Sequence, residues 1–370
     1  MTLSKSAAVL FKPFEGGHLK LDNRIVMAPM TRSFSPTGAP GPDVAGYYRR
    51  RAENGVGLII TEGTVINHPA AAADHGIPHF YGEEALAGWA QVVREVHEAG
   101  GKIAPQIWHT GMAREREKFP DSTANPVGPS GLSLTGEPLS EPLTVEEIKD
   151  IVQAYAQSAA DAKRIGFDAV EIHGAHGYLI DQFFWSFTNK RTDEYGGDMI
   201  GRTRFAVEVI EAVRAAVGPD FPIIFRYSQW KGTNYGEKLA ATPEELERFL
   251  ATLSKAGVDI FHASTRRFWE PEFEGSDLNL AGWTRKLTGK PTITVGSVGL
   301  DSDFVTLFTE GKGGQAAGID NLIERLERGE FDLVAVGRAL LSDPAWAAKI
   351  RDGRTEELLP FTREALATLS

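Results

Sequence analysis

The sequence predicts a (β/α)8 barrel, the TIM-barrel fold, on two observations. Eight short apolar runs bounded by turn-forming residues lie along the chain, as expected for parallel strands that are buried on both faces. Stretches with helical start patterns separate these runs, and a strand followed by a helix eight times over favours a closed barrel. A doubly wound open sheet is the weaker alternative, because no Gly-x-Gly-x-x-Gly follows the first run. The predicted strands span residues 24–29, 57–61, 102–108, 169–173, 223–227, 260–263, 292–295 and 333–336.

Capping and turn patterns define the elements around the predicted barrel. The segments 144–147 (Thr-x-x-Glu) and 242–245 (Thr-Pro-x-Glu) are capping boxes, in which a Thr hydroxyl and a Glu carboxylate accept from orphan amides at a helix start. Residues 10–21 predict a hairpin that closes the barrel floor, with Gly16-Gly17 as its turn. These patterns place the helices and the floor of the barrel.

Two long connections depart from a minimal barrel, at residues 109–142 after the third predicted strand and at 298–331 after the seventh. Long loops on the C-terminal face of a barrel usually carry function. The second connection contains a glycine-rich insertion at residues 311–318, which has the composition of a mobile loop. We therefore expect the functional site on this face.

Length and composition indicate one domain and exclude several classes of chemistry. The chain has 370 residues, 42% of them hydrophobic, so a single domain over residues 1–370 can bury one large core. It contains no cysteine, which excludes disulfides, iron–sulfur clusters and thiol catalysis. The scattered net charge of −11 disfavours nucleic-acid binding. No apolar run could span a membrane and residues 1–9 lack a signal-peptide pattern, so we expect a cytoplasmic protein without a membrane partner.

The last two predicted strands end in Gly296-Ser297 and Gly337-Arg338. Loops at these two positions form the recurrent phosphate site of TIM barrels, where glycines let amides approach the anion and an arginine donates two hydrogen bonds. The alternative is a pair of ordinary turns with a solvated arginine. Because the pattern occurs at both strands, phosphate binding is the favoured interpretation.

Gln106 and Arg226 are polar residues within or at the end of apolar strands. A buried amide is costly unless both its donor and its acceptor are used, and the pyrimidine edge of a flavin offers both. A buried guanidinium needs an acceptor, which the N1/O2 side of an anionic reduced flavin supplies. The alternative for Arg226 is an ion pair with a barrel carboxylate such as Glu171 or Glu62.

His173, His176 and Tyr178 follow one another closely at the end of the fourth predicted strand. In one interpretation the two imidazoles donate to a substrate carbonyl oxygen while the phenol supplies a proton. In a second, the histidines ligate a metal together with Glu62 or Asp181. In a third, they are structural histidines that bond the backbone. The three residues alone leave these interpretations open.

Six short segments together resemble the Old Yellow Enzyme family of flavin-dependent oxidoreductases. The resemblance runs from about residue 10 to residue 351, and the segments occur in the family's order, most of them at predicted strand ends. They are residues 23–32 (NRIVMAPMTR), 61–63 (TEG), 106–111 (QIWHTG), 171–181 (EIHGAHGYLID), 189–197 (NKRTDEYGG) and 336–338 (VGR).

The resemblance implies non-covalent FMN as the cofactor and NADH or NADPH as the electron donor. Thr31 corresponds to the residue that bonds flavin O4, Gln106 to the one at the pyrimidine edge and Arg226 to the one beside N1. The residues that the resemblance assigns to FMN are Pro29, Met30, Thr31, Gly63, Gln106, Arg226, Gly296, Ser297, Gly337 and Arg338.

The activity that the resemblance implies is ping-pong ene-reduction. NAD(P)H delivers a hydride to flavin N5 and leaves, and an α,β-unsaturated carbonyl compound then takes the hydride at Cβ. His173 and His176 would hold the carbonyl oxygen and Tyr178 would protonate Cα. The alternatives are a metal-dependent barrel hydrolase that uses the histidine pair and a noncatalytic flavin carrier.

Aromatic residues at two strand ends are predicted to shape the substrate pocket. Trp108 corresponds to a pocket aromatic of the family, and Phe268 and Trp269 follow the sixth predicted strand. Beside them, Arg266 and Arg267 either line the pocket, contact the nicotinamide cofactor or lie in solvent. The loop after the second predicted strand lacks the aromatic residue that some relatives place over the site. The resemblance therefore implies classes of substrate, namely enones and also nitro compounds and nitrate esters, and not a particular compound.

Overall fold

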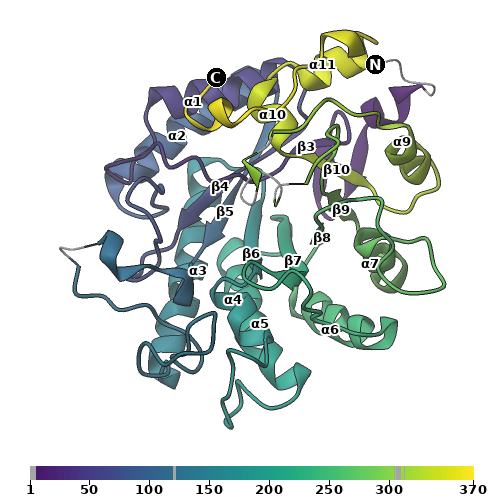
Figure 1. Cartoon of the computed structure of the whole chain (residues 1–370). Helices are drawn as coiled ribbons and strands as arrows, with labels where there is room; N and C mark the ends of the chain where they lie inside the picture. Colours follow the sequence, from purple (N-terminus) through teal and green to yellow (C-terminus); the bar gives the residue numbers. More distant parts are fainter. Residues whose placement is uncertain (1–5, 120–121, 304, 306–309, 312) are drawn as a thin grey trace.

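Eight parallel strands close into a barrel in the computed structural model, and helices surround it (Figure 1). The structure describes residues 6–119, 122–303, 305, 310–311 and 313–370. The strands follow the order β10-β3-β4-β5-β6-β7-β8-β9, so β10 closes the barrel by pairing with β3. Their bounds are β3 Ile25–Met27, β4 Leu58–Val65, β5 Lys102–Trp108, β6 Val170–His176, β7 Ile223–Lys231, β8 Ile260–Ser264, β9 Thr292–Val295 and β10 Leu333–Val336. The predicted TIM-barrel fold is confirmed, and each predicted run overlaps one of these strands.

Strands β4, β6 and β7 continue past their predicted ends by three or four residues. The register shifts between Ile60 and Gly63 in the β4–β5 pair, and between Gly174 and His176 in the β6–β7 pair. Such irregularities keep a strand paired while they change the direction of its side chains. Glu62 and Gly63, which follow the second predicted strand, and His176, which follows the fourth, therefore lie on strand.

The barrel interior is filled by small and branched apolar side chains from all parts of the sheet, and a hairpin closes it below. The hairpin strands β1 (Phe14–Gly16) and β2 (Leu19–Leu21) are antiparallel, and Phe14, Leu19 and Leu21 join the interior cluster. The turn is Gly17-His18, one residue later than predicted, because Gly16 pairs with Leu19. Both turn residues have positive φ, 55° and 64°, as a two-residue hairpin turn of type I′ requires.

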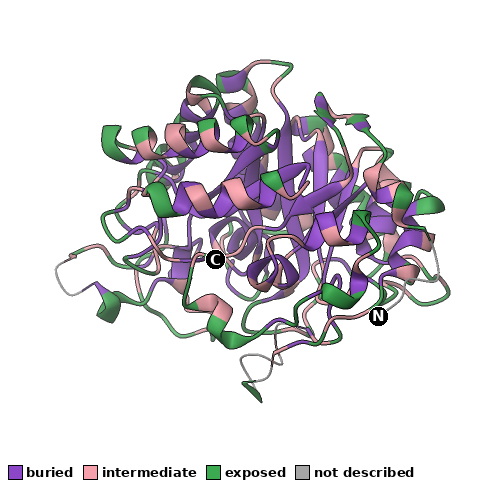
Figure 2. Cartoon of the chain, turned by 90° about the horizontal axis from the view of Figure 1, so that it is seen from above, coloured by how far each residue is buried: buried purple, intermediate pink, exposed green. Residues whose placement is uncertain are grey.

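A second and larger core lies between the sheet and the helices, where Figure 2 shows buried inner faces and exposed outer ones. The predicted capping box at the start of α3 is complete, whereas at α6 Thr242 accepts from Glu245 but the Glu245 carboxylate accepts from Ala241. Within the described residues, no helix is both long and apolar enough to cross a membrane. The helices are α1 Pro42–Glu53, α2 Glu83–Glu98, α3 Val145–Ile165, α4 Leu179–Phe184, α5 Met199–Val217, α6 Pro243–Ala256, α7 Leu280–Thr288, α9 Asp320–Glu327, α10 Arg338–Ser342 and α11 Trp346–Arg351.

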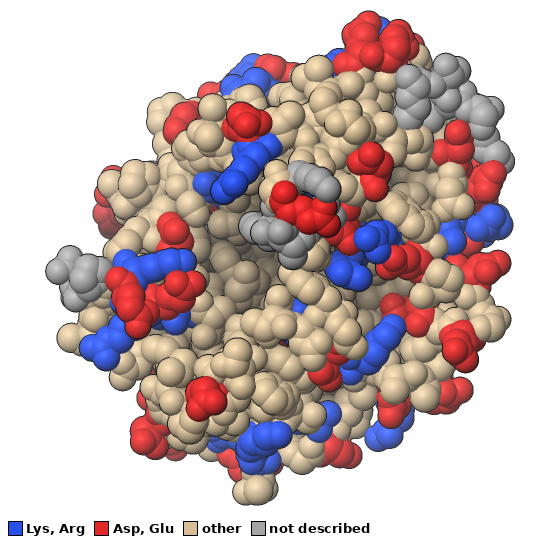
Figure 3. Space-filling view, viewed as in Figure 1, with Lys and Arg blue, Asp and Glu red and all other residues tan. Residues whose placement is uncertain are grey.

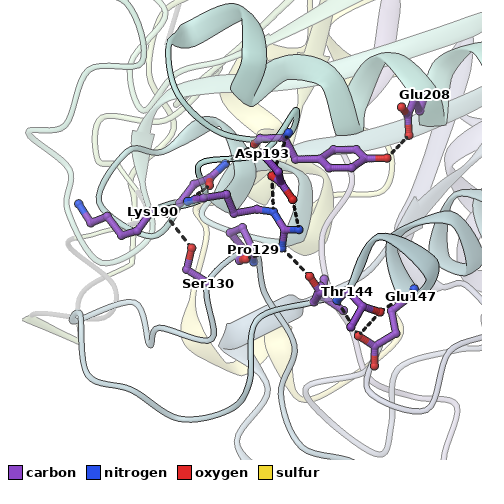
Figure 4. A network of polar contacts seen from close by, with 11 residues as sticks. Pro129, Ser130, Thr144, Glu147, Lys190, Asp193 and Glu208 are labelled. Carbon is purple, nitrogen blue, oxygen red and sulfur yellow. Dashed lines mark hydrogen bonds and ion pairs between the residues drawn. The ribbon is translucent and has the colours of Figure 1, made fainter.

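The long connection after β5 is fastened to the segment 189–197 by a network of polar contacts (Figure 4). Arg191 donates to the carbonyl oxygens of Pro129 (2.9 Å) and Leu143 (2.5 Å) and pairs with Asp193 at 2.5 Å. The amide of Lys190 donates to the Ser130 hydroxyl at 2.8 Å. Part of the family-like segment is thus structural, because it fixes a loop on the C-terminal face of the barrel.

The glycine-rich insertion is also fastened where the structure describes it. Gly314 forms a two-way backbone bridge with Phe361, and Ala316 bridges to Leu300. A Cβ on Gly313 would lie 2.1 Å from the carbonyl oxygen of Phe361, so only glycine allows this approach. Backbone bonds are thus formed at residues 314–317 of the insertion, while Lys312 lies outside the described residues, and the mobility expected from the composition stays a prediction.

Candidate active site

A cavity of about 500 Å³ opens at the C-terminal ends of the strands. The face seen in Figure 3 is hollowed near its centre. Arg226, Arg266 and Arg338 line the cavity, while no Asp or Glu among the described residues does. Its other lining residues from the predicted site are Pro29, Met30, Thr31, His176, Tyr178, Gly296, Ser297 and Gly337. A cavity with this lining favours an anionic ligand.

His173, His176 and Tyr178 form one aromatic cluster beside the cavity. The ring of His173 lies 5.2 Å from that of His176 and 5.1 Å from that of Tyr178, both edge to face. Trp108 packs against Tyr178 at 4.7 Å, and the indole of Trp230 stacks on His176 at 4.3 Å. The register irregularity in β6 brings the three residues together: His176 takes a positive φ of 67° there.

Burial, more than any neighbouring charge, holds the pKa values of His173 and His176 well below their usual range, and Arg226 lowers them further. Both imidazoles are therefore neutral near pH 7. The Nδ1 atom of His173 accepts from the Ala175 amide at 3.3 Å, so its proton is on Nε2 and can be donated. The Nε2 atom of His176 lies 2.8 Å from the Ser264 hydroxyl. Burial also raises the pKa of the Tyr178 phenol, which stays protonated.

A fully buried ion pair supports the turn that carries these residues. The Lys231 ammonium lies 2.5 Å from Asp181 Oδ1, and neither side chain is exposed. Asp181 Oδ2 accepts from the Gly177 amide at 2.7 Å, between His176 and Tyr178. On the adjacent strand, the Gly232 amide donates to the His176 carbonyl at 3.0 Å. The pair therefore fixes the backbone between the two cavity-lining residues.

Arg226 is a buried cation whose expected carboxylate partners bond other groups. Glu171 accepts from Gln106 Nε2 at 2.8 Å and contacts His262 Nδ1 at 2.7 Å. Glu62 accepts from backbone amides, as described below. The one hydrogen bond that Arg226 makes runs from Nη2 to Ser264 Oγ at 3.3 Å, and its buried Nε has no partner. Burial lowers the pKa of Arg226, which a bound anion would reverse.

Glu62 lies behind the Thr31 end of the cavity. Its Oε2 accepts from the amides of Arg32 (2.8 Å) and Ser33 (3.0 Å), while the buried Oε1 has no partner. Burial raises the pKa of Glu62 to about 7, although the two backbone donors lower it. Glu62 thus fixes the backbone that follows Thr31.

The ends of β9 and β10 form the most basic corner of the cavity. Gly296 has φ 134°, and a Cβ there would lie 2.7 Å from the Thr265 carbonyl oxygen. The Ser297 hydroxyl contacts the carbonyl oxygens of Arg266 (2.9 Å) and Ser302 (3.0 Å), so it holds the loop together. Burial lowers the pKa of Arg338 to about 10. Gly296, Ser297, Gly337 and Arg338 thus line the cavity together and combine strand-end glycines with a desolvated cation, which suits a phosphate.

The remaining predicted residues lie around the cavity but not in its wall. His173, Trp108, Gly63 and Gln106 lie one layer deeper, and a Cβ on Gly63 would lie 2.3 Å from the Trp108 ring. Phe268 and Trp269, predicted to line the pocket, do not. The Phe268 amide donates to the Gly296 carbonyl and the Phe268 carbonyl accepts from Asn279, which turns the ring into the core, and Trp269 packs on it from outside.

Several cavity residues were not identified from the sequence. Trp230 and Tyr235 take the place predicted for Phe268 and Trp269, since β7 continues to Lys231 beside His176. Of the arginine pair, Arg266 lines the cavity and lies over the Tyr235 ring at 5.3 Å, whereas Arg267 pairs with Asp303 and Glu270. The expected strand end at Tyr227 concealed this wall, because a Gly-containing stretch directly follows Lys231.

The carboxylates required by the metal interpretation are engaged elsewhere. Glu62 accepts from two amides, and Asp181 is paired with Lys231. Across the described residues, no group of three or more His, Asp and Glu side chains is arranged to hold a metal ion. The geometry therefore gives the hydrolase alternative no support.

The fold and the site define a barrel flavoprotein, with an anion-binding cavity and two neutral histidines beside a tyrosine. Comparison with known proteins agrees: the model of the NADH:flavin oxidoreductase / NADH oxidase family matches residues 9–357. The chain belongs to this family, the Old Yellow Enzyme family. The family description names a flavin as the group that its members share.

Individual relatives cover the chain to different extents. It is 35% identical over 362 residues to an NADH oxidase of Thermoanaerobacter brockii, with 94% of this chain and 52% of the relative covered. It is 42% identical over 226 residues to 12-oxophytodienoate reductase 7 of Oryza sativa subsp. japonica, covering 58% and 57%. The chain thus spans about half the length of these relatives. The structure of morphinone reductase in complex with tetrahydroNAD matches with a TM-score of 0.80 and 31% identity, covering 96% of this chain and 93% of that one.

Proposed function

We propose that this chain is an FMN-dependent ene-reductase that uses NADH or NADPH to reduce the activated C=C bond of α,β-unsaturated carbonyl compounds. The observation that carries the proposal is the cluster of His173, His176 and Tyr178. Two neutral imidazoles and a protonated phenol lie beside a cavity whose buried arginine lacks an anionic partner. Membership of a flavin oxidoreductase family supports the same chemistry.

The residues of the cavity fit FMN. Arg226 offers a buried, unpaired Nε to an anionic flavin edge, and Gln106 is held by Glu171 one layer below. Gly296, Ser297, Gly337 and Arg338 would hold the phosphate, and Pro29, Met30 and Thr31 would line the flavin site. Gly63, which packs under Trp108 outside the cavity wall, would support that site from behind. When bound, FMN supplies the chemistry of accepting a hydride from the nicotinamide and passing it to carbon.

The catalytic roles follow from protonation states. His173 and His176 would donate N–H groups to the substrate carbonyl oxygen and stabilise the negative charge that develops there. Because burial keeps both imidazoles neutral, they can donate without giving up a proton. Tyr178 would protonate Cα, and its raised pKa keeps the phenol protonated until that step. The Asp181–Lys231 pair would hold Tyr178 and His176 in position.

Aromatic walls support planar, cyclic enones as the substrate class. Tyr178, Trp230 and Tyr235 line the cavity, and Trp108 packs behind Tyr178. Rings with this arrangement favour flat unsaturated ligands. The names of the relatives, 12-oxophytodienoate reductase and morphinone reductase, agree with such a class. Arg266 at the cavity wall would attract an anionic part of the substrate or of the nicotinamide cofactor.

Anaerobic spectroscopy of the purified protein tests the proposal. We expect a yellow protein that NAD(P)H bleaches and that 2-cyclohexenone reoxidises. A yellow protein that NAD(P)H does not bleach would instead be a flavin carrier. A colourless protein that takes up no FMN on reconstitution would overturn the proposal, and stoichiometric zinc or manganese in it would favour the hydrolase alternative. Reduction of nitro compounds and nitrate esters, and the cytoplasmic location, stay predictions.

A further inference from the structure

The C-terminal residues 361–370, here called the C-terminal strap, form part of the cavity wall. Phe361 and Leu366 line the cavity together with Thr31 and Arg338. Figure 1 shows the end of the chain beside α1, a helix from the opposite end of the sequence. The strap therefore belongs to the site, although none of its residues was predicted there.

The first residue of the strap is fixed at the phosphate corner. Phe361 is 1% exposed, and its amide and carbonyl bond Gly314 at 2.8 and 2.9 Å. The guanidinium of Arg338 lies over the Phe361 ring, 5.4 Å from its centre. The nitrogens of the same guanidinium donate to the carbonyl oxygens of Ser302 and of Asp303 (3.2 Å), so the ring covers one face of a cation whose edge is held by the loop after β9. Phe361 thus packs on the arginine proposed to bind the FMN phosphate and separates it from solvent on that face.

The remainder of the strap is latched by Arg32, the neighbour of Thr31. Nη2 of Arg32 lies within hydrogen-bond distance of the carbonyl oxygens of Ala365 (3.0 Å), Leu366 (3.2 Å) and Thr368 (2.7 Å). The Arg32 side chain is 6% exposed and lies over the ring of Tyr47. Its amide is held by Glu62. Beyond the latch, two arginines of α1 donate to the carbonyls of the last two residues.

The strap is connected to the proposed cofactor residues at both ends and not to the catalytic cluster. Arg32 adjoins Thr31, and Phe361 packs on Arg338. His176, Tyr178 and Trp230 also line the cavity, but among the described residues the rings of His176 and Tyr178 contact other aromatic rings and not the strap. We propose that the C-terminal strap is a cofactor-retaining wall and that Arg32 is the latch that sets how slowly FMN leaves. The proposal rests on FMN binding and adds residues 32, 361 and 366 to that site.

The rate of FMN release from the holoprotein tests this role without requiring turnover. In Arg32→Met the apolar stem remains while the carbonyl donors are lost, and we expect FMN, followed by its fluorescence after dilution, to leave about tenfold faster. Arg202→Met is the matched control. Arg202 also donates to two carbonyl oxygens, those of Phe184 and Gly197, but it lies outside the cavity wall. The control is expected to keep the parent release rate.

A second variant decides the matter if Arg32→Met does not fold. Leu366→Ala removes a side chain from the wall and leaves the latch intact, and we expect faster FMN release here as well. If Arg32→Met and Leu366→Ala both fold and both release FMN at the parent rate, the proposal is overturned. Equal acceleration in Arg32→Met and Arg202→Met would also overturn it, because the effect would then be general destabilisation. A parent protein that binds no FMN would count against the proposed function instead.

Discussion

Replacing Lys231 by Met should destabilise the protein strongly, because it leaves Asp181 as an uncompensated charge in the core. Both side chains are fully buried and only 2.5 Å apart. Breaking such a pair from one side costs about 3–5 kcal/mol. With an unfolding entropy of about 2.1 cal/mol/K per residue, 370 residues imply about 0.8 kcal/mol/K, and the melting temperature should fall by about 4–6 °C.

The loss of melting temperature in Lys231→Met should increase with pH. Burial raises the pKa of Asp181, and Lys231 is the largest influence that lowers it. Without Lys231 the folded-state pKa rises further above the unfolded value of about 3.9, so the charged carboxyl opposes folding at high pH. The difference in melting temperature between parent and Lys231→Met should therefore be largest near pH 8 and shrink toward pH 5.

Differential scanning fluorimetry at a fixed, saturating FMN concentration measures these differences, because bound ligand itself raises the melting temperature. The matched variant is Lys231→Met combined with Asp181→Asn, which is neutral and keeps an acceptor for the Gly177 amide. It should recover most of the loss. A deficit below about 1 °C at pH 8, or one equal at pH 8 and pH 5, would refute the reasoning, since surface pairs are worth at most about 1 kcal/mol.

Three further changes probe the site. Tyr178→Phe should slow reoxidation of the reduced protein by 2-cyclohexenone at least about 100-fold and spare reduction by NAD(P)H in stopped-flow traces; equal loss in both half-reactions would contradict the proton-donor role. Burial raises the pKa of Glu62 to about 7, so its ionisation opposes folding as pH rises. The melting temperature of Glu62→Gln should therefore increase relative to that of the parent between about pH 5 and about pH 8. A constant difference in melting temperature across that range would contradict this expectation. Gly63→Ala places a Cβ 2.3 Å from the Trp108 ring and should cost about 1–3 kcal/mol and weaken FMN binding in a fluorescence titration; unchanged binding would show that Trp108 moves freely.

The barrel could be predicted because its strands are fully buried on both faces. Such strands need no alternation of apolar and polar residues, so they stand out as continuous apolar runs. The predicted bounds of β9 (Thr292–Val295) and β10 (Leu333–Val336) match the structure. The single domain over residues 1–370 stays a prediction. The hairpin was also predictable, but its turn was not, because Gly16-Gly17 and Gly17-His18 both supply a glycine and only pairing chooses between them.

The site was only partly predictable because strand irregularities and long-range contacts decide its walls. Periodicity ends β7 at Tyr227, yet pairing with His176 extends it to Lys231 and brings Trp230 into the cavity. Phe361 and Leu366 reach the cavity through contacts with residues more than 20 positions away, which no local pattern contains. Conversely, Phe268 and Trp269 had the composition of a pocket wall, but backbone bonds turn Phe268 into the core.

The continuation of β6 and β7 past the barrel rim has a consequence for how this enzyme class diversifies. Because His173, His176 and their support at Lys231 lie on paired strand, the geometry proposed to hold the substrate oxygen belongs to the barrel scaffold. Tyr235 lies beyond the end of β7 and Arg266 beyond the end of β8, where sequence can change at little structural cost. Mutational libraries confined to residues 233–241 and 265–271 should therefore shift substrate preference while the reaction chemistry is retained.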